Sequence, residues 1–144
     1  MKLSKLSPSD VNETTGIQGE WAVYYLLKAY GLHVVKQPHM WAFDLWINDK
    51  LNVEVKTAKP RVTTTRTNLP AWHFNIHRHG KLPERQPDFY LFRLEDIPYT
   101  RKAIHLLLKA PVTVMTIGIT LRSLLNQDWY KEREEFLKLV GRGQ

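Results

Sequence analysis

The sequence contains no cysteine and no long apolar run, and both absences restrict what the protein can be. Without thiols, the chain forms neither disulfides nor thiolate metal sites. Its apolar segments are too short to cross a bilayer, so we expect no transmembrane helix. The first residues, from Met1 to Pro8, lack the apolar stretch of a signal peptide. We therefore expect a cytoplasmic, intracellular protein.

Acidic residues are also fewer than basic ones. The chain has 14 Asp and Glu against 21 Lys and Arg, which gives a formal charge of +7. This balance favours a polyanionic partner such as a nucleic acid, although many basic proteins bind none. The hydrophobic fraction of 43% is too high for a disordered chain. The length predicts a single domain, residues 1–144, with one core.

Three ionisable residues lie inside short apolar runs, where charge is expensive to bury. Asp44 lies in one run, and the segment from Leu51 to Thr57 carries Glu54 and Lys56. In a strand, residues two apart share a face, so Glu54 and Lys56 point the same way. Charged groups in such runs need a partner or a metal ion. Two carboxylates beside an ammonium predict a site for a divalent cation and a phosphate.

A helix is predicted from about residue 15 to residue 29, after a polar lead-in over residues 1–13. Glu20 lies on the apolar stripe of this helix, where a carboxylate is unusual. The alternative is an edge position at which Glu20 reaches solvent or pairs with Lys28 or Lys36. The stripe has the spacing of one helical face and consists of Ile17, Trp21, Tyr24 and Leu27.

The remaining chain reads mainly as strands. A polar loop is predicted over residues 58–71, a hairpin turn over residues 48–50 and a final helix from residue 128 to residue 140. We expect an α/β fold with an α+β-like mixed sheet flanked by helices. The strands are predicted at about 32–36, 42–47, 51–57, 72–76, 88–94, 102–109 and 112–117. The periodicity of residues 102–109 also allows a helix, and a strand is favoured because the segment is short.

Strict alternation in the segment after residue 71 divides its residues between two faces. Trp72, Phe74 and Ile76 form an apolar face, which we assign to the core. The opposite face is a row of polar residues, His73, Asn75, His77 and His79. It is predicted to face solvent or DNA. A zinc site is the alternative, which the lack of cysteine and the distant carboxylates disfavour.

The ionisable residues occur in an order that resembles the PD-(D/E)XK nuclease superfamily. The segment Gly16-Ile17-Gln18-Gly19-Glu20 precedes Asp44, and Glu54-Val55-Lys56 follows. The first segment and the Val53-to-Thr57 strand are similar to archaeal Holliday-junction resolvases and to small endonucleases of the group I intron type. The resemblance covers roughly residues 16–95 and implies a restriction-endonuclease-like core. Phe43 stands where the family pattern has proline.

The resemblance implies a Mg²⁺-dependent endodeoxyribonuclease in which Mn²⁺ can substitute. Asp44 and Glu54 would bind the metal, with the Val55 carbonyl between Glu54 and Lys56. Lys56 would orient the nucleophile and offset charge in the transition state. Glu20 would bind a second metal ion or hold a water on the first. A mundane alternative is a surface ion-pair cluster on an amphipathic hairpin.

Basic and imidazole side chains in two segments are candidate nucleic-acid contacts, which would set affinity and salt dependence. They are Lys59, Arg61, Arg66, His77, Arg78, His79, Lys81 and Arg85. An enzyme of this size needs two active sites to cut both strands, so we expect a homodimer or higher homo-oligomer. Two other readings remain: a catalytically silent nucleic-acid-binding module on a nuclease fold, and an unrelated basic domain with an accidental motif. The choice between DNA and RNA also stays open.

Overall fold

The main sheet of the protein has five strands and mixed direction. The computed structural model describes residues 8–37, 43–62, 70–77, 80–98, 100, 102–125 and 128–141. Strands β3 and β6 pair in parallel, and the other neighbours in this sheet pair antiparallel. The spatial order is β1 (Val34–Lys36), β2 (Leu45–Ile47), β3 (Leu51–Ala58), β6 (Phe89–Leu94) and β7 (Ile104–Lys109).

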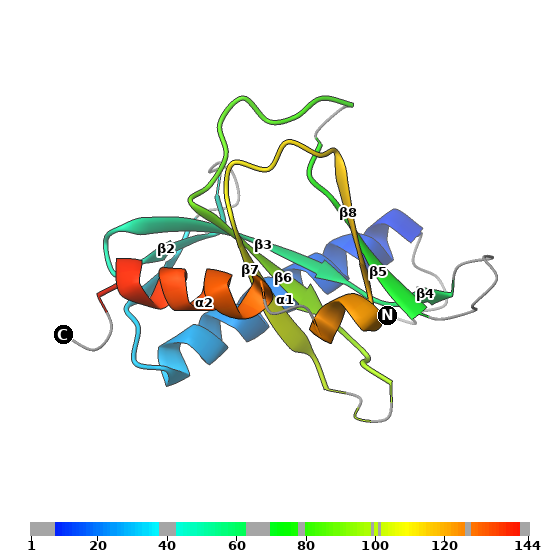
Figure 1. Ribbon diagram of the computed structural model, residues 1–144, viewed down its shortest axis with the longest axis horizontal. Helices are drawn as coiled ribbons and strands as arrows, with labels where there is room; N and C mark the ends of the chain where they lie inside the picture. Colours follow the sequence, from blue (N-terminus) through cyan, green and yellow to red (C-terminus); the bar gives the residue numbers. More distant parts are fainter. Residues whose placement is uncertain are drawn as a thin grey trace.

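A second, smaller sheet packs on one face of the first. Figure 1 shows its strands β5 and β8 side by side, although they are far apart in the sequence. The order is β4 (Arg61–Val62), β5 (Pro70–Asn75) and β8 (Thr116–Thr120). The apolar face of β5 meets Tyr90 and Phe92 of β6 in a buried cluster. The predicted alternation in β5 is confirmed, since Trp72 and Phe74 are buried and His73 is exposed.

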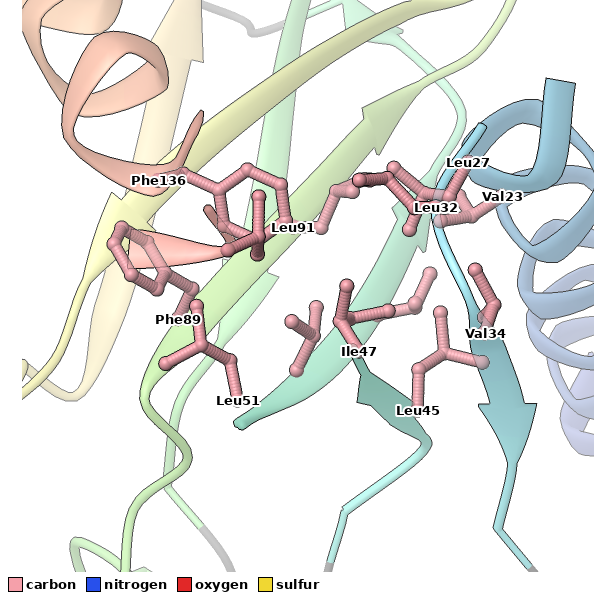
Figure 2. Packing of buried hydrophobic residues seen from close by; sticks show 13 residues of the cluster. Val23, Leu27, Leu32, Val34, Leu45, Ile47, Leu51, Phe89, Leu91 and Phe136 are labelled. Atoms are coloured by element: carbon pink, nitrogen blue, oxygen red, sulfur yellow. The ribbon is translucent and has the colours of Figure 1, made fainter. Parts of the chain in front are cut away.

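Two α-helices, α1 (Pro8–Ala29) and α2 (Asp128–Leu139), cover the other face of the five-stranded sheet. Figure 2 shows Phe136 of α2 over Leu91, while Val23 and Leu27 of α1 enter the same cluster from the far side. A short 3-10 helix, η2 (Arg122–Leu125), precedes α2. Because β6 lies between the two layers, both of its faces are buried.

The hairpin between β2 and β3 fixes the register of the central strands. Asn48 and Asp49 have φ angles of 49° and 54°, which suit the tight turn that joins two twisted strands. The Asn48 side chain also accepts a hydrogen bond from the His33 N–H at 2.7 Å and donates one to the Val140 carbonyl at 2.8 Å. The predicted turn is thus confirmed, and its side chain ties three parts of the chain together.

The prediction for the first helix was wrong at its start and on its buried face. The helix begins at Pro8 rather than near residue 15, and proline is favoured in a first helical turn because its missing N–H has no partner there. Of the predicted stripe, Ile17 is 44% exposed and Trp21 is 43% exposed, whereas Leu27 is buried as predicted. The buried line reaches Leu27 through Gly19 and Val23 rather than through Ile17 and Trp21. Glu20 therefore lies beside the buried line rather than on it.

Two predictions further along the chain were also wrong. The predicted strand over residues 112–117 is instead β8 at Thr116–Thr120. Val112 is buried outside the sheet because the Gln86 side chain bonds both its N–H and its carbonyl, at 2.7 and 2.8 Å. The predicted loop over residues 58–71 contains the short strand β4 and the start of β5. No helix within the described ranges has the length and hydropathy to span a membrane.

Candidate active site

The centre of the candidate site is an ion pair on β3, between Glu54 and Lys56. Strand alternation places Val53 and Val55 in the helix-covered core and turns Glu54 and Lys56 to the opposite face. The Lys56 Nζ lies 3.1 Å from a Glu54 carboxylate oxygen. Glu54 is 7% exposed and is the one buried polar or charged residue in the part of the chain that the structure describes. A carboxylate held this far from water requires compensation.

Asp44 lies next to this pair, immediately before β2. In the β2–β3 register Leu45 faces Val53, so one further step places Asp44 opposite Glu54. The Asp44 carboxylate accepts a hydrogen bond of 2.7 Å from the Val55 N–H. The sequence-predicted pair of carboxylates is therefore brought together by the hairpin.

Glu20 reaches the same place from α1. Its carboxylate lies 3.1 Å from the Lys36 Nζ, and both side chains are about three-quarters buried. Glu20 thus pairs with Lys36, as the alternative raised by the sequence had it. Glu20 also lies near enough to Asp44 to raise the pKa of that carboxyl group. The helix and the hairpin therefore bring three carboxyl groups together.

The environment of Asp44 changes its protonation. The pKa of Asp44 is raised from its ordinary 3.8 to about 7, and burial is the largest cause. The charge of Glu20, the hydrogen bond with Glu20 and the charge of Glu54 add to the rise in pKa, while the Val55 N–H opposes it. Ionised Asp44 would be a buried negative charge beside two further carboxyl groups, which is unfavourable. A bound cation would relieve it.

A close contact between α1 and β3 explains how Glu20 comes so near. A methyl group added at Gly19 would lie 1.8 Å from the Thr57 Oγ1. The helix therefore approaches the strand at a distance that only glycine permits. The Thr57 hydroxyl is buried and makes no hydrogen bond in the structure. Thr57 acts in packing the helix against the strand.

The residues present fit a hard cation. Mg²⁺ takes oxygen ligands, needs only one or two carboxylates and keeps several waters. Asp44 and Glu54, with the Val55 carbonyl between Glu54 and Lys56, offer such donors. No group of three or more His, Asp or Glu among the described residues is arranged to hold a metal by itself. In the structure, Glu54 forms an ion pair with Lys56 and Glu20 forms one with Lys36, so neither carboxylate is directed at a common metal position.

The predicted nucleic-acid contacts are placed in different surroundings. Lys59 and Arg61 are exposed and line one pocket together with Lys56. Arg85 is exposed, and its guanidinium lies 5.5 Å from the centre of the Phe43 ring. Phe43 is the residue directly before Asp44 in the chain.

The other predicted contacts lie between Arg61 and Arg85 in the chain. Lys81 is exposed, whereas His77 is partly buried, with a buried Nδ1 that has no hydrogen-bond partner. Three of the predicted contacts lie outside the described residues, and they are Arg66, Arg78 and His79.

Two features of the site were not in the predicted set of site residues. Lys36 holds Glu20, and its Nζ lies 5.1 Å from the centre of the Trp21 ring. The sequence offered one signal for Lys36, a basic residue at the end of a predicted strand. From that signal, Lys36 was considered only as a possible ion-pair partner of Glu20. His73 lines the same pocket as Lys56. Its place on the polar face of β5 could be predicted, but its nearness to Lys56 could not, because no local pattern tells which strands of the two sheets meet.

Comparison with known proteins supports the fold. The chain matches no family model and no curated protein. Among solved structures, the bacterial homing endonuclease I-Ssp6803I has a similar fold, with a TM-score of 0.59 over 91% of this chain and 94% of that chain. The two sequences are 16% identical, so the likeness concerns the fold. The predicted mixed α/β fold with helices flanking the sheet is confirmed.

Proposed function

We propose that this protein is a metal-dependent DNA endonuclease of the PD-(D/E)XK type. The observation that carries the proposal is the buried Glu54, paired with Lys56 on a central strand and placed beside Asp44. The stability of the fold does not explain this cluster, since a buried ion pair adds little to the free energy of unfolding. The fold of a homing endonuclease supports the same class of activity. The fold alone would not fix it, because folds host many functions.

Asp44 and Glu54 would hold Mg²⁺, or Mn²⁺ in its place, together with the Val55 carbonyl. The cation would supply Lewis-acid polarisation of the phosphodiester. The Val55 N–H, at 2.7 Å, fixes the orientation of the Asp44 carboxylate before substrate arrives. Glu20 adds a third carboxyl group, whose position Lys36 holds. It would orient a water on the side of α1.

Lys56 would interact directly with the substrate. Its ammonium group now lies 3.1 Å from Glu54 and is partly exposed, so a phosphate oxygen can approach it from solvent. There it would donate hydrogen bonds to a non-bridging oxygen and offset the charge that develops as the phosphorus–oxygen bond breaks. Because Glu54 keeps the ammonium in place, little reorganisation is needed when the substrate binds.

A panel of DNA substrates tests this proposal. The panel comprises single strand, duplex, nick, flap, four-way junction and plasmid, each with Mg²⁺ and with Mn²⁺. We expect the parent to cut at least one substrate and both Asp44→Ala and Lys56→Ala to cut none. DNA binding without cleavage by the parent would replace the enzyme with a binding module. Unaltered cleavage by both variants would place the active site elsewhere.

A homodimer or higher homo-oligomer is part of the proposal, because one site serves one strand of a duplex. Light scattering coupled to size-exclusion chromatography measures the mass directly. A mass of two or more chains is the expected result. If the protein is monomeric alone and also on DNA, it would cut one strand at a time, and nicked plasmid would accumulate before linear plasmid.

A further inference from the structure

A second polar depression adjoins the candidate active site. It is a pocket of about 420 Å³ between the end of β3, β4 and β5, and Thr15 of α1 also lines it. Lys56 belongs both to this pocket and to the ion pair with Glu54. A molecule held by Lys56 therefore touches the pocket and the carboxyl cluster at once. We call it the basic pocket, and its polar residues include Lys56, Lys59, Arg61, His73 and Asn75.

The charges of the basic pocket have one sign. Lys56, Lys59 and Arg61 come from one continuous segment, and no Asp or Glu is among the described residues that line the pocket. Lys59 and Arg61 are exposed, and no ion pair within the described part of the chain involves either of them. Cations gathered in a concave surface focus a positive potential there. The pocket therefore favours an anion.

Hydrogen-bonding side chains complete the wall on the side of β5. His73 and Asn75 are exposed and lie on the same face of the strand, opposite the buried Trp72 and Phe74. The His73 ring packs over its cross-strand partner Gly118, where an added methyl group would lie 3.5 Å from the Nδ1. The imidazole thus rests on backbone. Phe74, which lines the pocket, is itself 3% exposed, so among the described residues the His73 imidazole is the one aromatic ring that the pocket presents.

We propose that the basic pocket binds one phosphate of the DNA backbone, next to the phosphate that Lys56 contacts. Lys59 and Arg61 supply the charge, and Asn75 and His73 bond the phosphate or its sugar. The inference rests on the proposed function for the choice of DNA as the ligand. It adds a positioning subsite, which fixes how the strand passes the carboxyl cluster.

The salt dependence of binding distinguishes one shared phosphate from separate contacts. Binding of a DNA duplex to metal-free protein is measured by fluorescence anisotropy at several salt concentrations. Each neutralised phosphate contributes about 0.9 to the slope of log K against log salt. If Lys59 and Arg61 share one phosphate, the double variant Lys59→Gln/Arg61→Gln should flatten the slope by about 0.9, and each single variant by less. Asn75→Ala should weaken binding several-fold with the slope unchanged.

Lys50→Gln is the matched control, since Lys50 is an exposed lysine in the turn between β2 and β3 and does not line the pocket. It should behave as the parent. A double variant that keeps the parent slope would overturn the proposal. A loss of about 1.8, the sum of two separate contacts, would also overturn it. A flattened slope on duplex RNA but not on DNA would reject DNA as the ligand.

The binding measurement is independent of cleavage, so the subsite and the enzyme can fail separately. If the parent cuts no DNA but the slope changes as expected, the proposed enzyme is rejected and the pocket stands as a DNA contact. If the parent cuts DNA and the double variant keeps the parent slope, the enzyme stands and the subsite is rejected. With both intact, the double variant should raise KM for DNA and also lower kcat, because the strand is then less well positioned.

Discussion

At the scale of single residues, Asp44 combines a proposed metal-binding role with a cost in stability. Its pKa is raised to about 7, first by burial and then by Glu20. In the unfolded chain the same group titrates near 3.8. The folded state therefore binds more protons between these values, and ionising Asp44 destabilises the fold. This cost is absent below about pH 3.8, grows as the pH rises and is complete above about pH 7.

Asp44→Asn should therefore stabilise the metal-free protein. The amide oxygen can still accept from the Val55 N–H, while its NH₂ group can donate to Glu20. We expect the melting temperature to rise by about 3 °C or more at pH 8, relative to the parent, and the gain to vanish near pH 4. Mg²⁺ should then raise the melting temperature of the parent but not that of the variant. A variant less stable than the parent at pH 8 would contradict the destabilising effect of ionised Asp44.

His105 has the opposite effect on stability. Burial, and secondly the charge of Arg93, lowers the pKa of His105 from 6.5 to about 4. The Arg93 Nη1 lies 2.9 Å from the His105 Nε2. Because a guanidinium only donates, that nitrogen must be the unprotonated acceptor. The stabilising contribution of neutral His105 is complete above about pH 6.5 and is lost as the pH falls toward 4.

Replacing His105 with a residue that accepts without titrating should remove part of the acid sensitivity. For His105→Gln we expect a smaller fall in melting temperature between pH 6.5 and pH 4 than for the parent. His33→Gln is the control, since His33 is exposed and only its backbone N–H bonds a side chain. Equal falls in the parent and in His105→Gln would show that His105 does not carry this dependence.

At the scale of elements, the docking of α1 on β3 depends on one glycine. A methyl group at Gly19 would collide with the Thr57 hydroxyl, whereas one at Gly16 would meet nothing within 4 Å. Both glycines lie in the same helix, so helix propensity alone predicts a gain of up to about 1 kcal/mol from either change to alanine. The comparison of the two positions therefore isolates the contact between helix and strand.

Gly19→Ala should lower the free energy of unfolding by about 1–3 kcal/mol, the usual cost of overpacking. Gly16→Ala should leave it unchanged or raise it. Because Glu20 follows Gly19, DNA cleavage should fall in Gly19→Ala alone. Adding Thr57→Ala removes the closest atom and should restore part of both losses. Chemical denaturation measures the stabilities, and equal values for the two alanine variants would contradict the close contact.

The elements also indicate what local sequence patterns could predict. Asp44, Glu54 and Lys56 were found because charges inside short apolar runs and strand alternation are local properties. The start of α1 was missed because the polar residues before residue 14, serine and aspartate among them, suit a turn or loop as well as the start of a helix. The burial of Gly19, in place of Trp21, depends on the approach of β3. The strand at 112–117 was misplaced because Gln86, far away in the chain, bonds the Val112 backbone.

At the scale of the whole molecule, the protein has three layers: the helices, the five-stranded sheet and the small sheet. The candidate site lies on the central layer, the five-stranded sheet. Helix α1 contributes Glu20 from one side, and the β2–β3 hairpin contributes Asp44 and Glu54. The small sheet forms one wall of the basic pocket on the other side. The mixed α/β class could be predicted from the sequence. The packing of β4, β5 and β8 as a separate layer could not, because strand patterns alone do not say which strands pair.

The most direct test compares two lysines on the preferred DNA substrate with Mg²⁺. Lys56→Met removes the ammonium beside Glu54, and Lys50→Met removes one from the exposed turn of the same hairpin. The expected result is a fall of about 10²-fold or more in single-turnover rate for Lys56→Met. The rate for Lys50→Met should remain within about twofold of the parent. Equal rates for the two variants would contradict the assignment of the Glu54–Lys56 pair to the active site.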